Sequence, residues 1–307
     1  MKRIPNPRRM LFIGGLQRSG TTLLGRSLAE HPLVAGLHQT GTDEDEGQFV
    51  QDVYLDDHIM GHRGNRTQGR VARWAYHPEA HLTEQDAHRT PDAATRLTAA
   101  WSPYVTDPTA PYLVEKSPSN MTRFRFLQEA FPDAGFVLIT RHPIIQALAI
   151  RKWSPRSAQI GLDLSPIIDH WFTAMDIARE DASKISNLRV VAYENLIREP
   201  ATVLRGIQVF FGLPPQEVRA EHFRDESAKY TKYWTRVSDG KPIDSSMLLN
   251  PRASGRSAVP RFLERHLAPR FGPGNLRRIR AQYGSRFSEY GYSLDDLDTV
   301  TTWRHLP

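Results

Sequence analysis

The stretch Met10-Leu-Phe-Ile-Gly-Gly-Leu-Gln-Arg-Ser-Gly-Thr-Thr-Leu-Leu24 decides how the chain is expected to fold. Its apolar start, Met10 to Ile13, predicts a short buried strand, two glycines end that strand, and a helical pattern of leucines follows Thr22. A strand, a glycine-rich turn and a helix cradle phosphate, because backbone N–H groups and the positive end of the helix dipole point into the turn. The stretch therefore predicts an α/β protein with a phosphate-binding loop.

The spacing from Gly15 to Thr22 is G-x-x-x-x-G-T-T, which matches the nucleotide phosphate loop with one change. Thr21 stands where a kinase-type loop has the lysine that holds the β- and γ-phosphates. The cation lies inside the loop instead, at Arg18. The loop thus predicts binding of a phosphate-like group without the standard means of handling a triphosphate with a metal ion. The alternative is a glycine turn that merely joins strand to helix.

Composition limits the classes of function. The 307 residues include 40 Lys and Arg against 34 Asp and Glu, and this mild excess favours an anionic ligand without indicating nucleic acid. The absence of cysteine excludes disulfides and thiolate chemistry and fits a reducing compartment, so a cytoplasmic protein is expected. No apolar run is long enough for a bilayer, and no membrane partner is expected. Residues 1–9 are interpreted as a basic, solvated tail.

Two further strands are expected to end in cations. The strand that begins at Tyr112 ends at Lys116, and the clearest buried strand ends at Thr140, directly before Arg141. In open α/β sheets, ligands bind beyond the carboxyl ends of the strands. Lys116 and Arg141 are therefore expected to face the same crevice as Arg18, although a surface Glu–Lys pair would also explain Lys116.

The sequence between Leu24 and Tyr112 carries weaker structural signals. A weak apolar run, Leu33 to Leu37, is a possible second strand. Residues 51–111 show little apolar periodicity apart from a predicted helix, Ala93 to Trp101.

These motifs together resemble a sulfotransferase that uses 3′-phosphoadenosine 5′-phosphosulfate (PAPS). The resembling pieces are Arg18-Ser-Gly-Thr-Thr-Leu-Leu24, Glu115-Lys-Ser-Pro118, Phe136-Val-Leu-Ile-Thr-Arg-His-Pro143, Tyr193-Glu-Asn-Leu196 with its helix ending Phe210-Phe-Gly-Leu-Pro214, and Tyr290-Gly-Tyr292. The match is nearer to the bacterial and tyrosylprotein branch than to the cytosolic small-molecule enzymes. It implies a P-loop-containing three-layer α/β/α fold with a mostly parallel central sheet. It also implies one domain, 1–307, with an acceptor or lid region at 40–75 and a part at 216–307 that closes over the donor.

The resemblance assigns a role to each motif. The residues that would bind the donor are Arg18, Ser19, Gly20, Thr21, Thr22, Arg141 and Tyr193. The loop residues would hold the 5′-phosphate, Arg141 the 3′-phosphate, and Tyr193 the adenine or nearby groups. Arg18 and Lys116 would neutralise charge on the leaving oxygen. The donor is a co-substrate, and the family requires no metal.

One family position departs from the pattern. The family commonly has a serine on the 3′-phosphate where this chain has Ala149. Either Arg151, Lys152 or the basic loop Arg252-Ala-Ser-Gly-Arg256 would then substitute, or the contact with the 3′-phosphate would be weaker. The loop is equally consistent with a solvated surface.

The general base must take a proton from the acceptor hydroxyl within hydrogen-bond reach. Cytosolic relatives use a histidine, and the tyrosylprotein branch uses a glutamate shortly after the His-Pro that ends the first helix. That neighbourhood here reads His38-Gln39. His38 is the chosen base, because its unperturbed pKa suits proton transfer near neutral pH. Glu46 and Glu115 are the alternatives.

The acceptor is expected to be a small molecule or a peptide. The acidic residues 43–46 would attract a cationic acceptor, or would simply face solvent. Trp153, Trp171 and Trp234 would line an acceptor pocket or belong to the core. A small-molecule kinase and a non-catalytic nucleotide-binding relative are the alternative functions. Thr21 argues against the first, and the two cations Arg18 and Lys116 argue against the second.

Overall fold

The computed structural model describes residues 8–62, 73–151, 164–217, 219, 223–241, 259–298 and 300–301. Several sequence expectations fall outside these ranges. They concern Lys152, Trp153, the loop Arg252 to Arg256, most of the tail 1–9 and part of the region 40–75.

The central sheet has five parallel strands in the order β2-β3-β1-β4-β5. The strands are β1 (Arg9–Gly14), β2 (Val34–Ala35), β3 (Tyr112–Lys116), β4 (Gly135–Thr140) and β5 (Leu188–Ala192). Ile13 is in register with Lys116, and Gly14 with Leu138, so the three central strands end at the same edge of the sheet. The predicted α/β fold with a parallel central sheet is confirmed.

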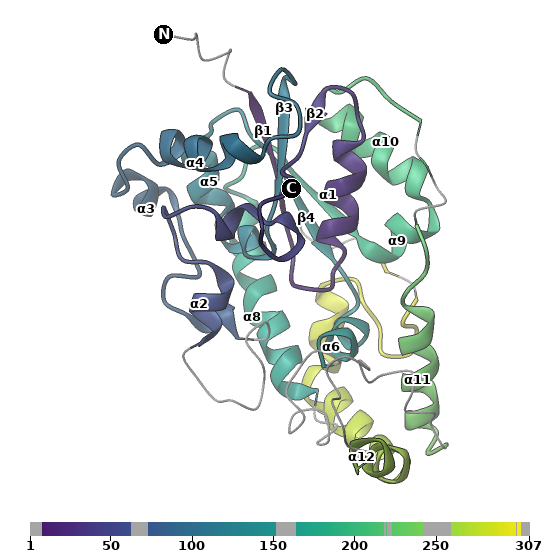
Figure 1. The fold of residues 1–307 in the computed structure, drawn as a ribbon. Coiled ribbons are helices and arrows are strands. Elements are labelled where there is room, and N and C mark those ends of the chain that lie inside the picture. The colour runs from purple at the N-terminus through teal and green to yellow at the C-terminus, as the bar shows by residue number, and fades with distance from the viewer. Residues whose placement is uncertain are drawn as a thin grey trace.

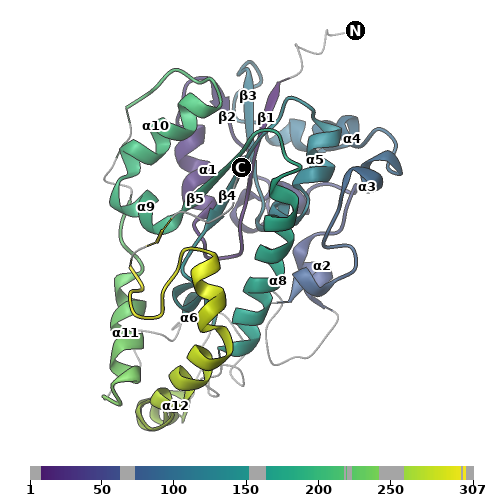
Figure 2. The same ribbon diagram turned by 180° about the vertical axis from the view of Figure 1, so that it is seen from behind.

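Helices cover both faces of the sheet (Figures 1 and 2). One layer contains α1 (Thr21–Ala29), α9 (Tyr193–Arg198) and α10 (Pro200–Phe210), and the other contains α4 (Ala93–Trp101), α5 (Phe124–Ala130) and α8 (Ser165–Ala182). Side chains alternate between two cores along β1: Leu11 packs in the core of the first layer and Phe12 in that of the second. Burial on both faces explains why the strands are continuous apolar runs.

The remaining elements lie mainly around the carboxyl ends of the strands. They are the helices α2 (Asp57–His62), α3 (Glu84–His88), α6 (Pro143–Arg151), α11 (Ala228–Ser238) and α12 (Val259–Glu289), and the 3₁₀ turns η1 (Asp43–Asp45), η2 (Gly47–Phe49), η4 (Trp74–Tyr76), η5 (Ser102–Tyr104) and η6 (Pro118–Thr122). Trp171 and Trp234 are buried members of the larger core, as the second interpretation of these tryptophans predicted. Among the described residues, no helix is both long and apolar enough to span a membrane.

Candidate active site

The loop between β1 and α1 has a backbone conformation and close contacts that require glycine at two positions. Gly15 has φ 156° and Gly20 has φ 104°. A Cβ on Gly15 would lie 2.3 Å from the carbonyl oxygen of Ile139, and one on Gly20 would lie 2.6 Å from the ring of Tyr193. Arg18 also has a positive φ, 69°, a conformation that costs free energy in a residue with a side chain and that is frequent at functional sites. The loop is therefore a tightly packed turn held against β4 and α9.

The start of α1 presents donors to this turn. The first intrahelical hydrogen bond runs from the N–H of Leu24 to the carbonyl of Gly20, at 3.0 Å. The N–H groups of the preceding turn, including those of Thr21 and Thr22, have no acceptor within the helix. Ser19 Oγ is fully buried and makes no hydrogen bond with any described residue. N–H groups without an acceptor in the helix, a buried hydroxyl and a helix N-terminus fit a bound phosphate.

Arg141 joins this loop to Tyr193. It follows β4, is 5% exposed, and donates to the carbonyl of Arg18 at 2.8 Å. Its guanidinium lies 4.1 Å from the centre of the Tyr193 ring, and its Nε has no hydrogen-bond partner among the described residues. The structure thus brings together the loop, Arg141 and Tyr193.

Two residues of this cluster were missed by the sequence analysis. Ser227 Oγ accepts a hydrogen bond from Arg141 at 2.7 Å. Tyr230, on α11, is 5% exposed. Burial raises the pKa of Tyr230 against the charges of Lys229, Arg141 and Arg18. No motif marks either residue, because their place depends on how α11 packs.

Lys116 approaches the loop from the end of β3. Its stem passes over Gly25 of α1, where a Cβ would lie 2.9 Å from Lys116 Cγ. Its Nζ lies 3.3 Å from Oε1 of Glu46, and both residues are 8% exposed. A cation and a carboxylate are therefore paired beside α1.

Glu46 is held in a buried polar environment. Its Oε2 accepts a hydrogen bond of 2.7 Å from the side-chain amide of Gln48. Burial raises the pKa of Glu46 to about 7, with a further rise from the charge of Asp57 and an opposing effect of Lys116. A general base works best when its pKa lies near the working pH.

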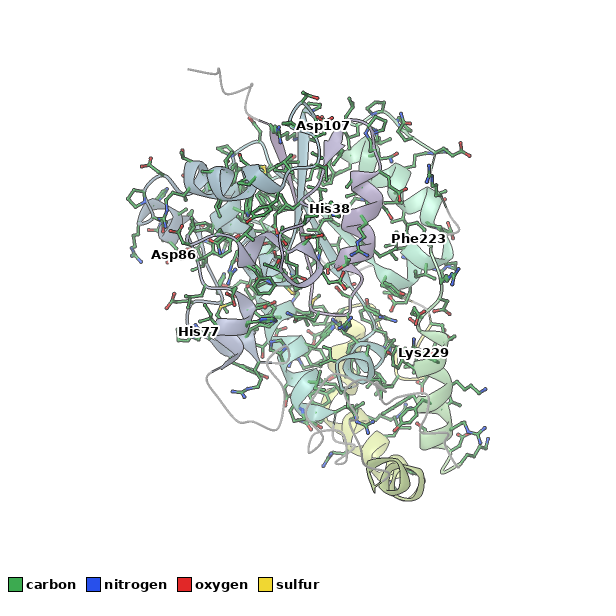
Figure 3. All side chains as sticks on the ribbon, viewed as in Figure 1. His38, His77, Asp86, Asp107, Phe223 and Lys229 are labelled. Atoms are coloured by element: carbon green, nitrogen blue, oxygen red, sulfur yellow. The ribbon has the colours of Figure 1, made fainter. Side chains whose placement is uncertain are left out.

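The other two candidate bases have different surroundings. His38 (Figure 3) has a side chain that is 64% exposed and lies 3.5 Å from Oδ2 of Asp45. Glu115 is fully buried and accepts hydrogen bonds from Ser117 Oγ at 2.6 Å and from the N–H of Gly47 at 3.0 Å. Glu115 therefore ties η2 to β3, and the loop that carries Glu46 depends on it.

The remaining predicted positions lie on α6 and η1. Ala149 is 3% exposed in the core, and Arg151 donates to the hydroxyl of Tyr233 at 3.2 Å. Glu44 forms an exposed ion pair with Arg26 at 3.0 Å. The part of the chain that the structure describes contains no group of three or more His, Asp or Glu residues able to hold a metal ion.

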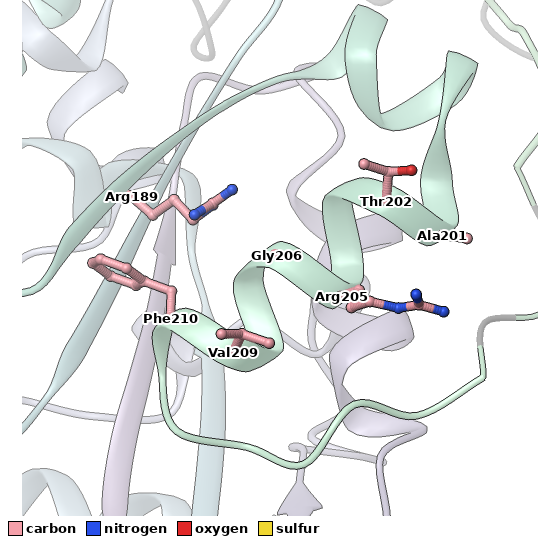
Figure 4. A pocket seen from close by; sticks show the side chains of 7 residues that line it. All are labelled: Arg189, Ala201, Thr202, Arg205, Gly206, Val209 and Phe210. Atoms are coloured by element: carbon pink, nitrogen blue, oxygen red, sulfur yellow. The ribbon is translucent and has the colours of Figure 1, made fainter.

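A hollow of about 590 Å³ lies elsewhere, between α10 and β5 (Figure 4). Its lining includes Arg189, Arg205 and Phe210, and none of its residues belongs to the loop or strand ends described above.

Comparison with known proteins gives consistent matches. Residues 10–217 match the model of a family described as the sulfotransferase family. A protein-tyrosine sulfotransferase of Drosophila melanogaster is 25% identical over 224 residues, which are 69% of this chain and 40% of the relative. Protein-tyrosine sulfotransferase A of Caenorhabditis elegans is 23% identical over 211 residues, 66% of this chain and 50% of the relative. The chain thus spans about half the length of these relatives or less. The crystal structure of a sulfotransferase from Alicyclobacillus acidocaldarius aligns with this chain at 17% sequence identity and a TM-score of 0.46. The alignment covers 90% of this chain and 96% of the Alicyclobacillus chain.

Proposed function

The chain belongs to the sulfotransferase family, and we propose that it transfers a sulfuryl group from PAPS to a hydroxyl or amine of an acceptor. One observation carries the proposal: a phosphate loop without its lysine lies against Arg141 and Tyr193, and the helix α1 that follows the loop lies against Lys116, which is paired with Glu46.

The donor side of the site would hold two separate anions. The loop N–H groups with the hydroxyls of Ser19, Thr21 and Thr22 bind the 5′-phosphate. Arg141 binds the 3′-phosphate, and Tyr193 lies beside the adenine. The buried hydroxyl of Ser19 and the unsatisfied Nε of Arg141 support this assignment, because buried polar groups without partners are rare unless a ligand satisfies them.

The C-terminal part of the chain would complete the donor site. Ser227 and Tyr230 lie beside Arg141, which supports the proposal that residues 216–307 close over the donor.

The acceptor side would carry the proton transfer. PAPS supplies an activated sulfuryl group. Glu46 takes the proton of the acceptor hydroxyl, whose oxygen bonds to sulfur while the bond from sulfur to the 5′-phosphate oxygen breaks and 3′-phosphoadenosine 5′-phosphate leaves. Arg18 and Lys116 stabilise the negative charge on that leaving oxygen. The burial of Glu46 and its contact with Lys116 favour it over His38, whose side chain is mostly exposed.

The acceptor class follows from the relatives. Both are named for protein tyrosine, so a tyrosyl hydroxyl of a peptide is the first acceptor to test, with small hydroxyl or amine compounds as the second class.

The test begins with donor binding and ends with turnover. In a thermal-shift assay, 3′-phosphoadenosine 5′-phosphate is expected to raise the melting temperature, and ATP with magnesium is not. Preference for ATP would indicate a kinase. Labelled PAPS incubated with a tyrosyl peptide library and with small-molecule extracts then identifies the acceptor. Donor binding without transfer to any of them would indicate a non-catalytic relative.

A further inference from the structure

A chain of buried and partly buried hydrogen bonds joins the phosphate loop to Glu46. The side-chain amide of Gln17, in the loop, donates to Oδ2 of Asp57 at 2.5 Å. The side-chain amide of Gln48 donates to the same oxygen at 2.9 Å and to Oε2 of Glu46 at 2.7 Å. Two buried carboxyl groups, Asp57 and Glu46, therefore share one amide.

The orientation of the shared amide is determined by its other partners. Oε1 of Gln48 accepts from the backbone N–H of Asp57 at 3.1 Å and from Ser119 Oγ at 2.7 Å. A backbone N–H only donates, so the amide oxygen must face it, and the amide nitrogen must face the two acids. Both hydrogens of Gln48 are therefore used by Asp57 and Glu46.

Gln17 is oriented by the same argument. Its Oε1 accepts from the indole N–H of Trp74 at 3.0 Å, and an indole N–H only donates. Its nitrogen therefore faces Asp57. The carbonyl of Gln17 accepts from Gln146 at 2.7 Å, which ties the loop to α6.

Glu46 and Asp57 have different charged neighbours. Lys116 on β3 is the cation in contact with Glu46. Asp57 is 2% exposed, and its Oδ1 has no hydrogen-bond partner among the described residues; His58 lies 3.9 Å from it. The charges that act on Asp57 also include those of Arg123, before α5, and Asp56. Glu115 lies nearby on β3, with its oxygens bonded to neutral donors.

We propose that Asp57 is a positioning residue that acts through Gln48: it orients Glu46, strengthens it as a base, and ties it through Gln17 to the loop that holds the donor. The role in the reaction rests on the proposed function above. The electrostatic part does not, because two carboxyl groups that share one buried amide interact whatever the protein catalyses.

The first test measures the titration of Glu46 directly. In protein labelled with ¹³C at the carboxyl groups of Asp and Glu, the Glu46 signal is identified by its loss in Glu46→Gln. Its midpoint is expected near 7, where the raised pKa of Glu46 places it. Asp57→Asn keeps an acceptor for both glutamines but removes the charge, so the midpoint should fall by about one unit.

Two further variants make the test specific. Asp56→Asn removes an equal charge one residue away and should leave the midpoint unchanged. Gln48→Met removes the hydrogen bond that stabilises the ionised Glu46, so the midpoint should rise. An unchanged midpoint in Asp57→Asn, or an equal fall in Asp56→Asn, would overturn the proposal. If Asp57→Asn does not fold, Gln48→Met still decides, because an unchanged midpoint in that variant would show that the amide between the two acids does not act on Glu46 and would overturn the proposal.

The second test measures the pH dependence of sulfuryl transfer with the acceptor found above. The acidic limb of kcat/KM should move to lower pH in Asp57→Asn by as much as the Glu46 midpoint moves. A limb that stays in place while the midpoint moves would refute the role of Asp57 in the reaction. Failure of the proposed function gives a different result, because 3′-phosphoadenosine 5′-phosphate would then not raise the melting temperature of the wild type.

Discussion

At the scale of single residues, Glu46 and His38 make opposite predictions. Glu46→Gln should lower kcat by about 10²- to 10⁴-fold, the range that positioned proton transfer contributes, while donor affinity changes little. His38→Gln should retain most of the activity, because the side chain of His38 is 64% exposed and its ring lies beside Asp45. Steady-state kinetics with PAPS separates the two. Loss of turnover in His38→Gln with full activity in Glu46→Gln would establish the histidine as the base.

Arg141 gives a second prediction at this scale. A lysine in its place keeps the charge but cannot donate to Arg18 and Ser227 together or stack on Tyr193. Affinity for 3′-phosphoadenosine 5′-phosphate should therefore fall about tenfold to a hundredfold in Arg141→Lys, which corresponds to one lost charged hydrogen bond. Affinity for adenosine 5′-phosphate, which lacks the 3′-phosphate, should change much less. Isothermal titration measures both, and Arg189→Lys in the hollow at β5 is the matched control. Equal losses for both nucleotides would contradict the assignment.

The sequence predicted the residues at strand ends better than those in loops. The positions of Lys116 and Arg141 follow from parallel strands ending at one edge, which a single sequence can indicate. The burial of Glu46 depends on Glu115 holding the N–H of Gly47, a contact between distant segments that no local pattern reveals. The choice between His38 and Glu46 therefore stays a prediction.

At the scale of elements, the contact between α1 and β3 passes through Gly25. A Cβ there would lie 2.9 Å from Lys116 Cγ and 3.3 Å from Lys116 Cβ, close to the backbone of β3. Gly25→Ala should therefore displace the Lys116 side chain at a cost in stability that the helix preference of alanine over glycine, about 1 kcal/mol, offsets only in part. Turnover should fall, because Lys116 is displaced from the loop. Gly284→Ala on α12, where the nearest atom would be Arg280 Cγ at 3.9 Å, is the control and should keep full activity. Urea unfolding of both variants measures their stability, and kcat measures the effect on turnover. Undiminished turnover in Gly25→Ala would contradict the role of Lys116.

Elements with strong local patterns were predicted well. The helix expected over Ala93 to Trp101 is α4, and the weak run Leu33 to Leu37 contains the two-residue strand β2. The turns η2 and η4 and the short helix α2 escaped prediction, because each is too short for apolar periodicity. Their side chains nevertheless build the polar network around Asp57.

At the scale of the whole molecule, buried titratable groups lower the free energy of unfolding at both ends of the pH range. Buried histidines do so at low pH, and the buried carboxyl group of Glu46 does so at high pH. Burial lowers the pKa of His142 to about 4 and that of His170 to about 3. The unfolded chain therefore takes up protons at these histidines below about pH 6.5, while the folded protein does not, so stability falls as the pH falls. Glu46 acts in the other direction, because its pKa is raised in the folded state. Its contribution to stability is complete below its ordinary pKa of 4.5 and is lost as the pH rises through about 7.

The contribution of Glu46 to this profile can be isolated by subtraction. The histidines contribute equally to the wild type and to Glu46→Gln, so they cancel in the difference between the two free energies of unfolding. The glutamine does not ionise, so the variant should gain stability relative to the wild type as the pH rises from 5 to 8, by about 2.5 kcal/mol for a pKa raised from 4.5 to about 7. Urea unfolding at pH 5, 6, 7 and 8 measures this difference, and any pH-independent cost of the substitution shifts all four values alike. His38→Gln, which changes an exposed side chain, should show no such gain. A constant difference for Glu46→Gln would mean that Glu46 titrates in the folded protein as it does in the unfolded chain, so that burial does not raise its pKa in solution.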